Sequence, residues 1–362
     1  MNAPALWAAR AGMAESAVRT RHLRRLWALP GTRLAVTDWP ASLGRRLQLV
    51  WHYWWQAHLL DCLVDAQLRS PDYDRVREIK RLIGTIRLRN GLRWTNRYYD
   101  DCAWLALALW RAGEELGVHR TEAVDVLAAR LRSGWTDHGG GGIWWRTKDD
   151  LKGVPSSGPA AILFTRLAAG GGDRADLQRA LSTVDWIEEW LVDPDTGLVL
   201  DGMRVNPDGE VREVVDWVFT YNQGTFIGAC AELAALTGSR VWAQVARRTV
   251  LAVCEHMTGK RGVLPGSGGG DGGLFPGIGA RYLARAAVLL EDKDAAQVVY
   301  LSAEAAWRNR VSAPGGPLFC SEWTEHAVVG QERDLSVQLS AWMLFEAAAM
   351  LEREGVHPHS SS

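Results

Sequence analysis

The sequence predicts an all-α protein in which six helical hairpins close into a ring, an (α/α)6 barrel with long loops on one face. Two observations carry this prediction. Apolar residues recur at helical spacing along most of the chain. The connections between the helical segments also alternate between short and long. Because a short connection makes consecutive helices antiparallel neighbours, this alternation places every long connection at the same end of the molecule.

Twelve helical segments follow from the apolar spacing and from the residues that start and stop helices. Strand-like alternation is confined to short pieces at 198–200 and 211–215, between glycine and proline residues. The expected helices run over residues 5–28, 41–69, 72–89, 99–117, 121–133, 157–169, 173–191, 223–238, 240–257, 274–290, 292–309 and 334–353.

The long connections lead into the even-numbered segments, which we expect to form the inner layer of the ring. An open helical solenoid is the alternative, but the chain shows no fixed-length repeat. We expect residues 1–355 to form a single barrel domain and residues 356–362 a disordered tail. The long connections span residues 29–40, 90–98, 134–156, 192–222, 258–273 and 310–333.

Composition excludes several classes of function. The 41 basic and 42 acidic residues nearly cancel, so no positive field exists for a nucleic-acid partner. The five cysteines lack the CxxC spacing of zinc or redox sites, so no metal site is expected. The arginines within residues 1–25 interrupt any secretory leader, which favours the cytoplasm. The apolar runs are shorter than the roughly 18 residues of a membrane span, so no membrane partner is expected, and no oligomeric state is assigned.

Tryptophan is in excess, with 19 residues against 7 tyrosines and 6 phenylalanines. Those within helices are explained by core packing: Trp51, Trp104, Trp110, Trp186, Trp190, Trp242, Trp307 and Trp342. Those in the long connections suit stacking on sugar rings, because they lie beside Asn, Gln, Asp and Arg side chains: Trp94, Trp135, Trp144, Trp145, Trp217 and Trp323.

Asp100 and Asp101 are the most distinctive polar residues, because they begin an otherwise apolar helical segment. A helix cap with a first-turn acid is the simpler interpretation, although one cap needs only one aspartate. Neighbouring side chains on a helix point about 100° apart, so the two carboxyl groups can reach the roughly 5–5.5 Å separation of a retaining glycosidase. Repulsion and aromatic surroundings would raise one pKa, which suits an acid beside a nucleophile.

Several segments resemble glycoside hydrolase family 76, the endo-α-1,6-mannanase family, over about residues 40–350. The matching segments are Tyr98-Tyr99-Asp100-Asp101-Cys102-Ala103-Trp104, Trp54-Trp55-Gln56-Ala57-His58, Gly142-Ile143-Trp144-Trp145, Tyr221-Asn222-Gln223-Gly224 and Arg333-Asp334-Leu335-Ser336. The resemblance implies an (α/α)6 barrel and retaining cleavage of α-1,6-linked mannose chains. It implies no metal ion or organic cofactor. It makes Asp100 the nucleophile and Asp101 the general acid/base.

In this hypothesis the aromatic residues of the loops line the substrate cleft and the polar ones bind sugar hydroxyls. The expected substrate-binding residues are Tyr99, Trp144, Trp145, Asp216, Tyr221, Asn222 and Gln223. Two alternatives stay open. A sugar isomerase or epimerase on the same barrel would recruit His58 with His138 or His326 as bases, and a non-catalytic carbohydrate-binding protein would use the aspartates only as cap and hydrogen-bond acceptor.

Overall fold

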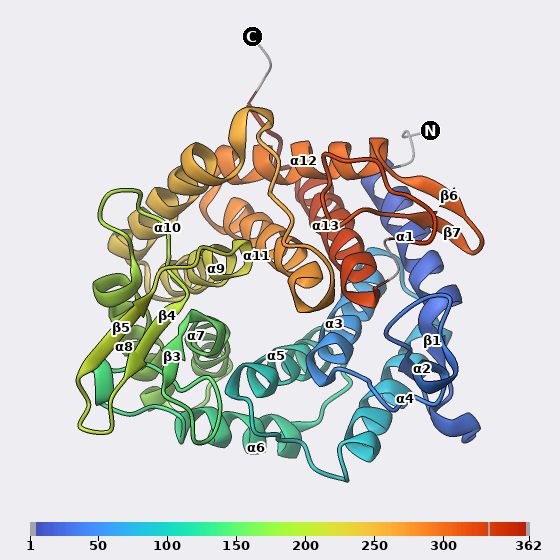
Figure 1. Cartoon of the computed structure of the whole chain (residues 1–362). Coiled ribbons are helices and arrows are strands. Elements are labelled where there is room, and N and C mark those ends of the chain that lie inside the picture. Colours follow the sequence, from blue (N-terminus) through green and yellow to red (C-terminus); the bar gives the residue numbers. More distant parts are fainter. Residues whose placement is uncertain (1–4, 332–333, 360–362) are drawn as a thin grey trace.

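The computed structural model describes residues 5–331 and 334–359, which form a ring of two concentric helical layers (Figure 1). The predicted (α/α)6 barrel is confirmed. The inner layer consists of α3 (Tyr53–Arg69), α5 (Tyr99–Leu116), α7 (Val154–Ala169), α9 (Thr220–Thr237), α11 (Phe275–Leu290) and α13 (Leu335–Glu354). The outer layer consists of α1 (Leu6–His22), α4 (Tyr73–Arg89), α6 (Thr121–Arg132), α8 (Arg174–Leu191), α10 (Arg240–Ala252) and α12 (Lys293–Arg308).

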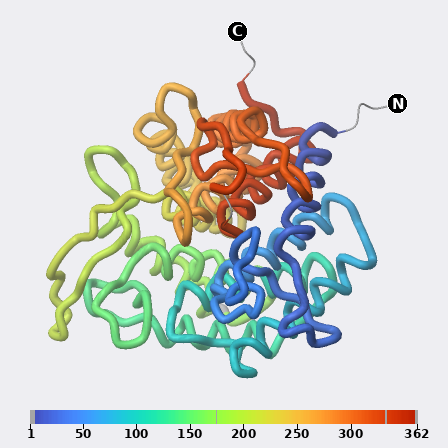
Figure 2. The backbone as a smooth tube through the Cα atoms, turned by 45° about the vertical axis from the view of Figure 1, so that its right-hand side comes forward, coloured from blue at the N-terminus to red at the C-terminus, as the bar shows by residue number. Residues whose placement is uncertain are grey.

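The ring closes because each inner helix packs on the next, and α13 packs on α3. Tight turns join each inner helix from α3 to α11 to the outer helix that follows it. The last inner helix pairs instead with α1, so the sixth helical pair is made from the two ends of the chain. In Figure 2 the blue and red segments lie side by side at this closure. The inner helices therefore all begin on the same face, the one that carries the long loops.

The first two expected helices are shorter in the structure. The segment 5–28 ends as a helix at His22, after which β1 (Leu23–Arg24) pairs with β2 (Leu34–Ala35) and a short turn, η1 (Leu26–Ala28), follows. The segment 41–69 divides into a single turn, α2 (Leu43–Arg46), and the inner helix α3. Gln48 and His52 lie between them at φ values of 53° and 44°, which end the helical path.

Small β elements decorate the loop face. The strand β3 (Leu151–Gly153) joins β4 (Gly202–Val205) and β5 (Val211–Val215) in an antiparallel sheet of order β3-β4-β5. A hairpin of β6 (Val311–Ala313) and β7 (Gly316–Leu318) packs beside α1. The alternating piece 198–200 contributes one bridge, between Val199 and Val192. Single helical turns complete this set: η2 (His138–Gly140), η3 (Val253–Met257), η4 (Gly259–Arg261) and η5 (Gly270–Leu274).

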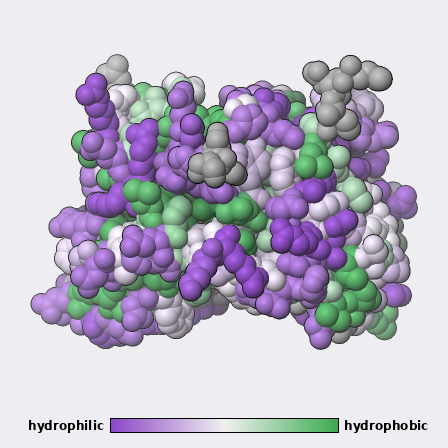
Figure 3. All heavy atoms as spheres, turned by 90° about the horizontal axis from the view of Figure 1, so that it is seen from above, coloured by the Kyte–Doolittle hydropathy of each residue, from purple (hydrophilic) through white to green (hydrophobic). Residues whose placement is uncertain are grey.

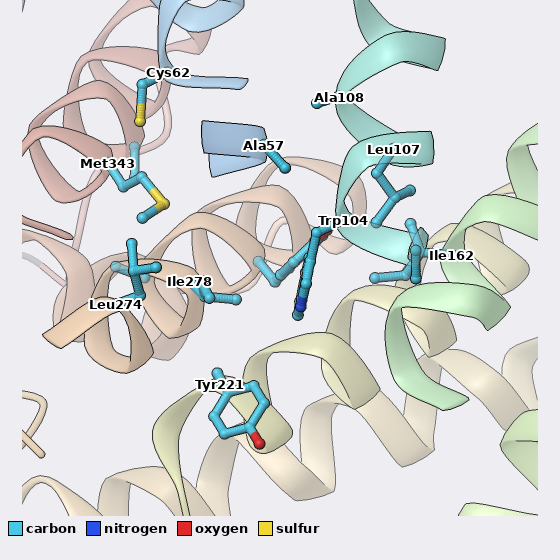
Figure 4. Close-up of a cluster of buried hydrophobic side chains, with 14 of the residues drawn as sticks. Ala57, Cys62, Trp104, Leu107, Ala108, Ile162, Tyr221, Leu274, Ile278 and Met343 are labelled. Atoms are coloured by element: carbon cyan, nitrogen blue, oxygen red, sulfur yellow. The ribbon is translucent and has the colours of Figure 1, made fainter. Parts of the chain in front are cut away.

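The core fills the inside of the ring. Figure 4 shows side chains from several inner helices converging there, with Trp104 of α5 and Ile278 of α11 extending toward the centre. The outer layer is amphipathic by comparison, and Figure 3 shows the wall at α12 as mostly hydrophilic with separate hydrophobic patches. None of the helices in the described ranges combines the length and apolar character needed to cross a membrane.

Candidate active site

The two adjacent aspartates lie in the first turn of α5, on the face where the inner helices begin. Tyr98 occupies the N-cap position, so neither aspartate is the cap. The backbone N–H of Asp101 donates a hydrogen bond of 2.8 Å to Oδ1 of Asp100. Since the N-terminus of a helix carries partial positive charge, this position stabilises a carboxylate on Asp100.

Asp100 receives a second hydrogen bond from the loop between α6 and α7. The indole Nε1 of Trp145 donates to its Oδ2 at 3.0 Å. Burial raises the pKa of Asp100 to about 7, while the backbone and indole donors oppose that rise. Asp100 therefore has an environment in which the ionised form can exist near neutral pH.

Asp101 has a different environment. Its Oδ2 accepts a hydrogen bond from the amide of Asn96, in the loop that precedes α5. Burial and the neighbouring charge of Asp100 raise the pKa of Asp101 well above its usual range. Because the two half-buried carboxyl groups are neighbours, the stronger rise in the pKa of Asp101 favours Asp101 over Asp100 as the carrier of a proton.

A third carboxylate, Asp271, faces the pair from η5, just before α11. Its charge adds to the rise in the pKa of both Asp100 and Asp101. The indoles of Trp54 and Trp55 both donate to its Oδ1, at 3.0 and 2.8 Å. Sequence reasoning did not single out Asp271. The available signal was one acid within a glycine-rich stretch directly before an inner helix.

Asp201 is another buried acid that the sequence did not reveal. Its Oδ1 accepts a hydrogen bond of 2.8 Å from the amide of Asn222, and the phenol of Tyr221 also donates to this carboxylate. Burial raises the pKa of Asp201, and burial with the nearby carboxylates raises that of Tyr221. The predicted residues Tyr221 and Asn222 therefore form one hydrogen-bonded group with Asp201.

Aromatic side chains form a row on this face. Trp217 is exposed and lies 6.1 Å from Phe219, whose ring is 5.1 Å from that of Phe275. Phe275 also stacks on Tyr221 at 4.2 Å and lies 6.5 Å from Trp54. The row links the exposed indole of Trp217 to Trp54, one of the two indoles that donate to Asp271. Such a surface suits the apolar faces of sugar rings.

Three other residues predicted to bind substrate have different surroundings. Tyr99 is buried beneath the guanidinium of Arg130, 4.0 Å from its ring. The amide of Gln223 donates to the carbonyl of Val199 at 2.7 Å and accepts from its N–H at 2.8 Å. Asp216 is exposed.

Lys152 organises the loop that carries Trp144 and Trp145. Its buried Nζ donates to the carbonyl oxygens of Thr136, His138 and Gly141 at 2.6–2.7 Å. It also lies 4.6 Å from the ring centroid of half-buried Trp144. One buried ammonium group thus holds the backbone that presents the indole of Trp145 to Asp100.

The expected division of the tryptophans needs correction. Trp94 and Trp323 belong to long loops, yet they are 8% and 2% exposed and pack in the core. Trp94 is covered because Arg87 lies 5.2 Å from its ring and Tyr53 bonds its carbonyl oxygen. Trp190 lies in α8, yet it is 41% exposed. Loop position alone therefore did not identify exposed indoles.

The histidines do not form a pair of bases beside the aspartates. His58 is buried next to Trp54 and Trp104, and burial lowers its pKa well below the usual range. His138 and His326 are exposed on loops. Within the described residues, no group of three or more His, Cys, Asp or Glu side chains could hold a metal ion. Arg333, part of one family-like segment, lies outside those residues.

A family model and several solved structures match this chain over most of its length. The model of glycosyl hydrolase family 76 matches residues 28–360. The GH76A α-1,6-mannanase of Salegentibacter sp. HEL1_6 is 33% identical with a TM-score of 0.84, over 95% of this chain and 99% of that one. Variants of that enzyme described as inactive, with two consecutive aspartates replaced, were solved with α-1,6-mannotriose and α-1,6-mannotetrose. The Lin0763 protein of Listeria innocua is 28% identical with a TM-score of 0.85, over 98% of this chain and 99% of that one.

A curated relative matches over a shorter segment. The mannan endo-1,6-alpha-mannosidase DCW1 of Candida glabrata is 30% identical over 160 residues, which are 40% of this chain. The match spans 35% of that relative's length. The family model, in contrast, extends across the barrel from before α2 to beyond α13. The chain therefore belongs to glycosyl hydrolase family 76.

Proposed function

We propose that this protein hydrolyses α-1,6-linked mannose chains with retention of configuration, using Asp100 as nucleophile and Asp101 as general acid/base. The observation that carries the proposal is the half-buried aspartate pair with unequal environments. Asp100 accepts hydrogen bonds from a helix N–H and an indole, whereas Asp101 lies beside its neighbour's charge and an amide. A retaining glycosidase needs one ionised and one protonated carboxyl group.

In the first step Asp101 gives its proton to the glycosidic oxygen as that bond breaks. Asp100 attacks the anomeric carbon, and a glycosyl ester with the Asp100 carboxylate forms. Asp101, now ionised, removes a proton from water, which attacks the same carbon and releases Asp100. Two inversions at one carbon restore the α configuration, so the first product is the α anomer.

The surrounding residues support sugar binding. The aromatic row from Trp217 to Trp54 offers stacking surfaces, and Oδ2 of Asp271 can accept a sugar hydroxyl while Oδ1 accepts the two indoles. No basic side chain among the described residues bonds to the catalytic pair, which suits a neutral glycan. The mannotriose and mannotetrose complexes of the Salegentibacter relative favour mannose among neutral glycans.

Incubation with linear α-1,6-mannan, followed by sizing of the products, tests the activity. We expect shorter oligosaccharides from the native protein, and we expect Asp100→Asn and Asp101→Asn each to lower turnover by roughly 10³-fold or more. Asp125→Asn is the matched control, because Asp125 is an exposed acid on the outer helix α6. NMR of the first product should show the α anomer.

Three results would overturn this proposal in different ways. Near-native hydrolysis by either aspartate variant would remove the assigned roles. An initial β anomer would exclude retention. Binding of oligomannosides in calorimetry, with no product after long incubation, would make the protein a carbohydrate-binding protein instead.

A further inference from the structure

A patch of exposed apolar side chains lies around α2, outside the catalytic machinery. Leu43 and Leu49 are 75% and 66% exposed. We name this set the α2 patch, and it consists of Trp27, Leu43, Leu47, Leu49, Val50 and Leu92. Large exposed apolar side chains that gather in one place mark interaction surfaces, whereas single ones need no explanation.

Hydrogen bonds show that the segments of the patch lie together. The indole of Trp27 donates to the carbonyl oxygen of Leu47 at 2.9 Å. The guanidinium of Arg89, near the end of α4, donates to the carbonyl oxygens of Gln48 and Leu49 at 3.1 and 3.2 Å. Arg89 also lies 5.8 Å from the ring centroid of Trp27. These contacts fix the patch as a defined surface.

The backbone of this surface is strained. Trp27, Gln48 and Leu92 have φ values of 48°, 53° and 61°. Residues other than glycine rarely adopt such φ values, and each residue that does costs roughly 1–3 kcal/mol. Two of these residues, Trp27 and Leu92, expose their apolar side chains to solvent, where they contribute little to stability, whereas Gln48 is buried. Such an arrangement points to a use outside the folding of the barrel.

Positive charge without acidic partners borders the patch. Arg24, Arg25 and Arg46 are exposed and line one side of a cavity of about 540 Å³. Arg24 and Arg46 donate to backbone carbonyl oxygens, and none of the three forms an ion pair with a carboxylate of the described residues. Their charges therefore remain available to an anionic partner.

The α2 patch also adjoins the active site along the chain. Residue 50 is followed directly by the turn into α3, whose first residues include the indoles that bind Asp271. Leu92 begins the loop that reaches Asn96 and then the aspartate pair. In Figure 1 α2 lies at the edge of the ring, beside β1 and α4.

We propose that the α2 patch and its arginines form a docking surface for an anionic phospholipid bilayer. The exposed leucines enter the interface, and the arginines contact lipid phosphates. The prediction of no membrane partner was based on the absence of long apolar runs that could span a bilayer. A protein that lies on the bilayer surface does not need such a run. Docking would bring the active site close to glycans attached to a membrane. This consequence rests on the proposed function, whereas the docking itself does not.

Flotation with vesicles tests the docking surface without any hydrolysis assay. We expect the native protein to float with vesicles of phosphatidylcholine and phosphatidylglycerol at 50 mM salt, and less at 500 mM salt or with pure phosphatidylcholine. Leu43→Ser with Leu49→Ser should weaken the partition by about tenfold or more. Arg25→Gln with Arg46→Gln should remove the preference for anionic vesicles.

Val241→Ser with Leu251→Ser is the matched control, because both residues are exposed on α10, which lies across the ring from α2 in Figure 1. The control should float like the native protein. The patch variants should keep native thermal unfolding and native turnover of a soluble oligomannoside. No binding by the native protein, or equal binding by patch and control variants, would overturn the proposal. A native dimer that only the patch variants dissociate, with no vesicle binding, would overturn it in favour of a second copy.

Discussion

At the scale of single residues, the aspartate pair couples stability to pH. Burial raises the pKa of Asp100 from 3.8 to about 7, so folding favours its protonated form. The contribution of protonated Asp100 to the stability of the fold is complete below 3.8, the pKa of this carboxyl group in the unfolded chain. It is lost as the pH rises toward 7. Asparagine stays neutral and can still accept the indole hydrogen bond of Trp145.

We therefore expect Asp100→Asn to melt a few degrees above the native protein at pH 8, and the two to melt together near pH 4. Thermal unfolding across this range measures the difference. Asp125→Asn should follow the native curve at every pH, since Asp125 is exposed. A difference between Asp100→Asn and the native protein that stays constant with pH would show that Asp100 is ionised in the folded state throughout.

The same scale shows why some site residues were predictable and others were not. Asp100 and Asp101 stand out because two acids interrupt an apolar helix at its start. Asp201 meets Asn222 only because the turn from β4 and β5 brings them together across 21 residues. From the sequence, Gln223 is expected to bind a sugar hydroxyl. In the structure both polar atoms of its amide are hydrogen-bonded to the backbone of Val199.

At the scale of elements, helical periodicity and the alternation of connections were sufficient for the barrel. The division of the segment 41–69 was not predictable, because its apolar pattern continues through the break. Tertiary contacts decide that break: Arg89 bonds the carbonyl oxygen of Gln48, and the side chain of Gln48 donates to Leu34. The boundary of the domain at residue 355 stays a prediction.

The loop between α6 and α7 depends on Lys152. Burial lowers the pKa of Lys152 to about 7, while three carbonyl oxygens surround its Nζ and favour the charged form. We expect Lys152→Met to lower the free energy of unfolding by about 3 kcal/mol, because buried carbonyl oxygens lose their donor. Turnover should also fall, because the loop presents Trp145 to Asp100.

Urea unfolding and steady-state kinetics measure the two effects. Lys148→Met is the control, since Lys148 is an exposed lysine of the same loop. Equal stability of the two variants would show that the carbonyl oxygens are satisfied without Lys152.

At the scale of the whole molecule, a largely buried network of charges joins the six inner helices, further along them than the site. Arg281 of α11 pairs with Asp61 and Asp65 of α3, and Arg111 of α5 pairs with the same two acids. Further pairs join α7 to α9 through Arg166 and Glu232, and α3 to α13 through Arg69 and Glu346. The network therefore involves every helix of the inner layer.

Arg281 is the member that links helices not adjacent in the ring, since α13 lies between α11 and α3 (Figure 1). Arg281→Met would leave the carboxylates of buried Asp61 and half-buried Asp65 with one arginine. We expect the free energy of unfolding to fall by about 3–5 kcal/mol, with little dependence on salt because the pairs are buried. Arg281→Met with Asp65→Asn should lose less than the single variant, because the excess negative charge is removed.

Urea unfolding at low and high salt measures these differences. Arg77→Met is the control, because it breaks an exposed pair with Asp74 and should cost less than about 1 kcal/mol. If Arg281→Met were no more destabilising than Arg77→Met, the charges would not hold the ring together. In that case the apolar layer of Figure 4, between the site and the network, would hold the inner helices by itself.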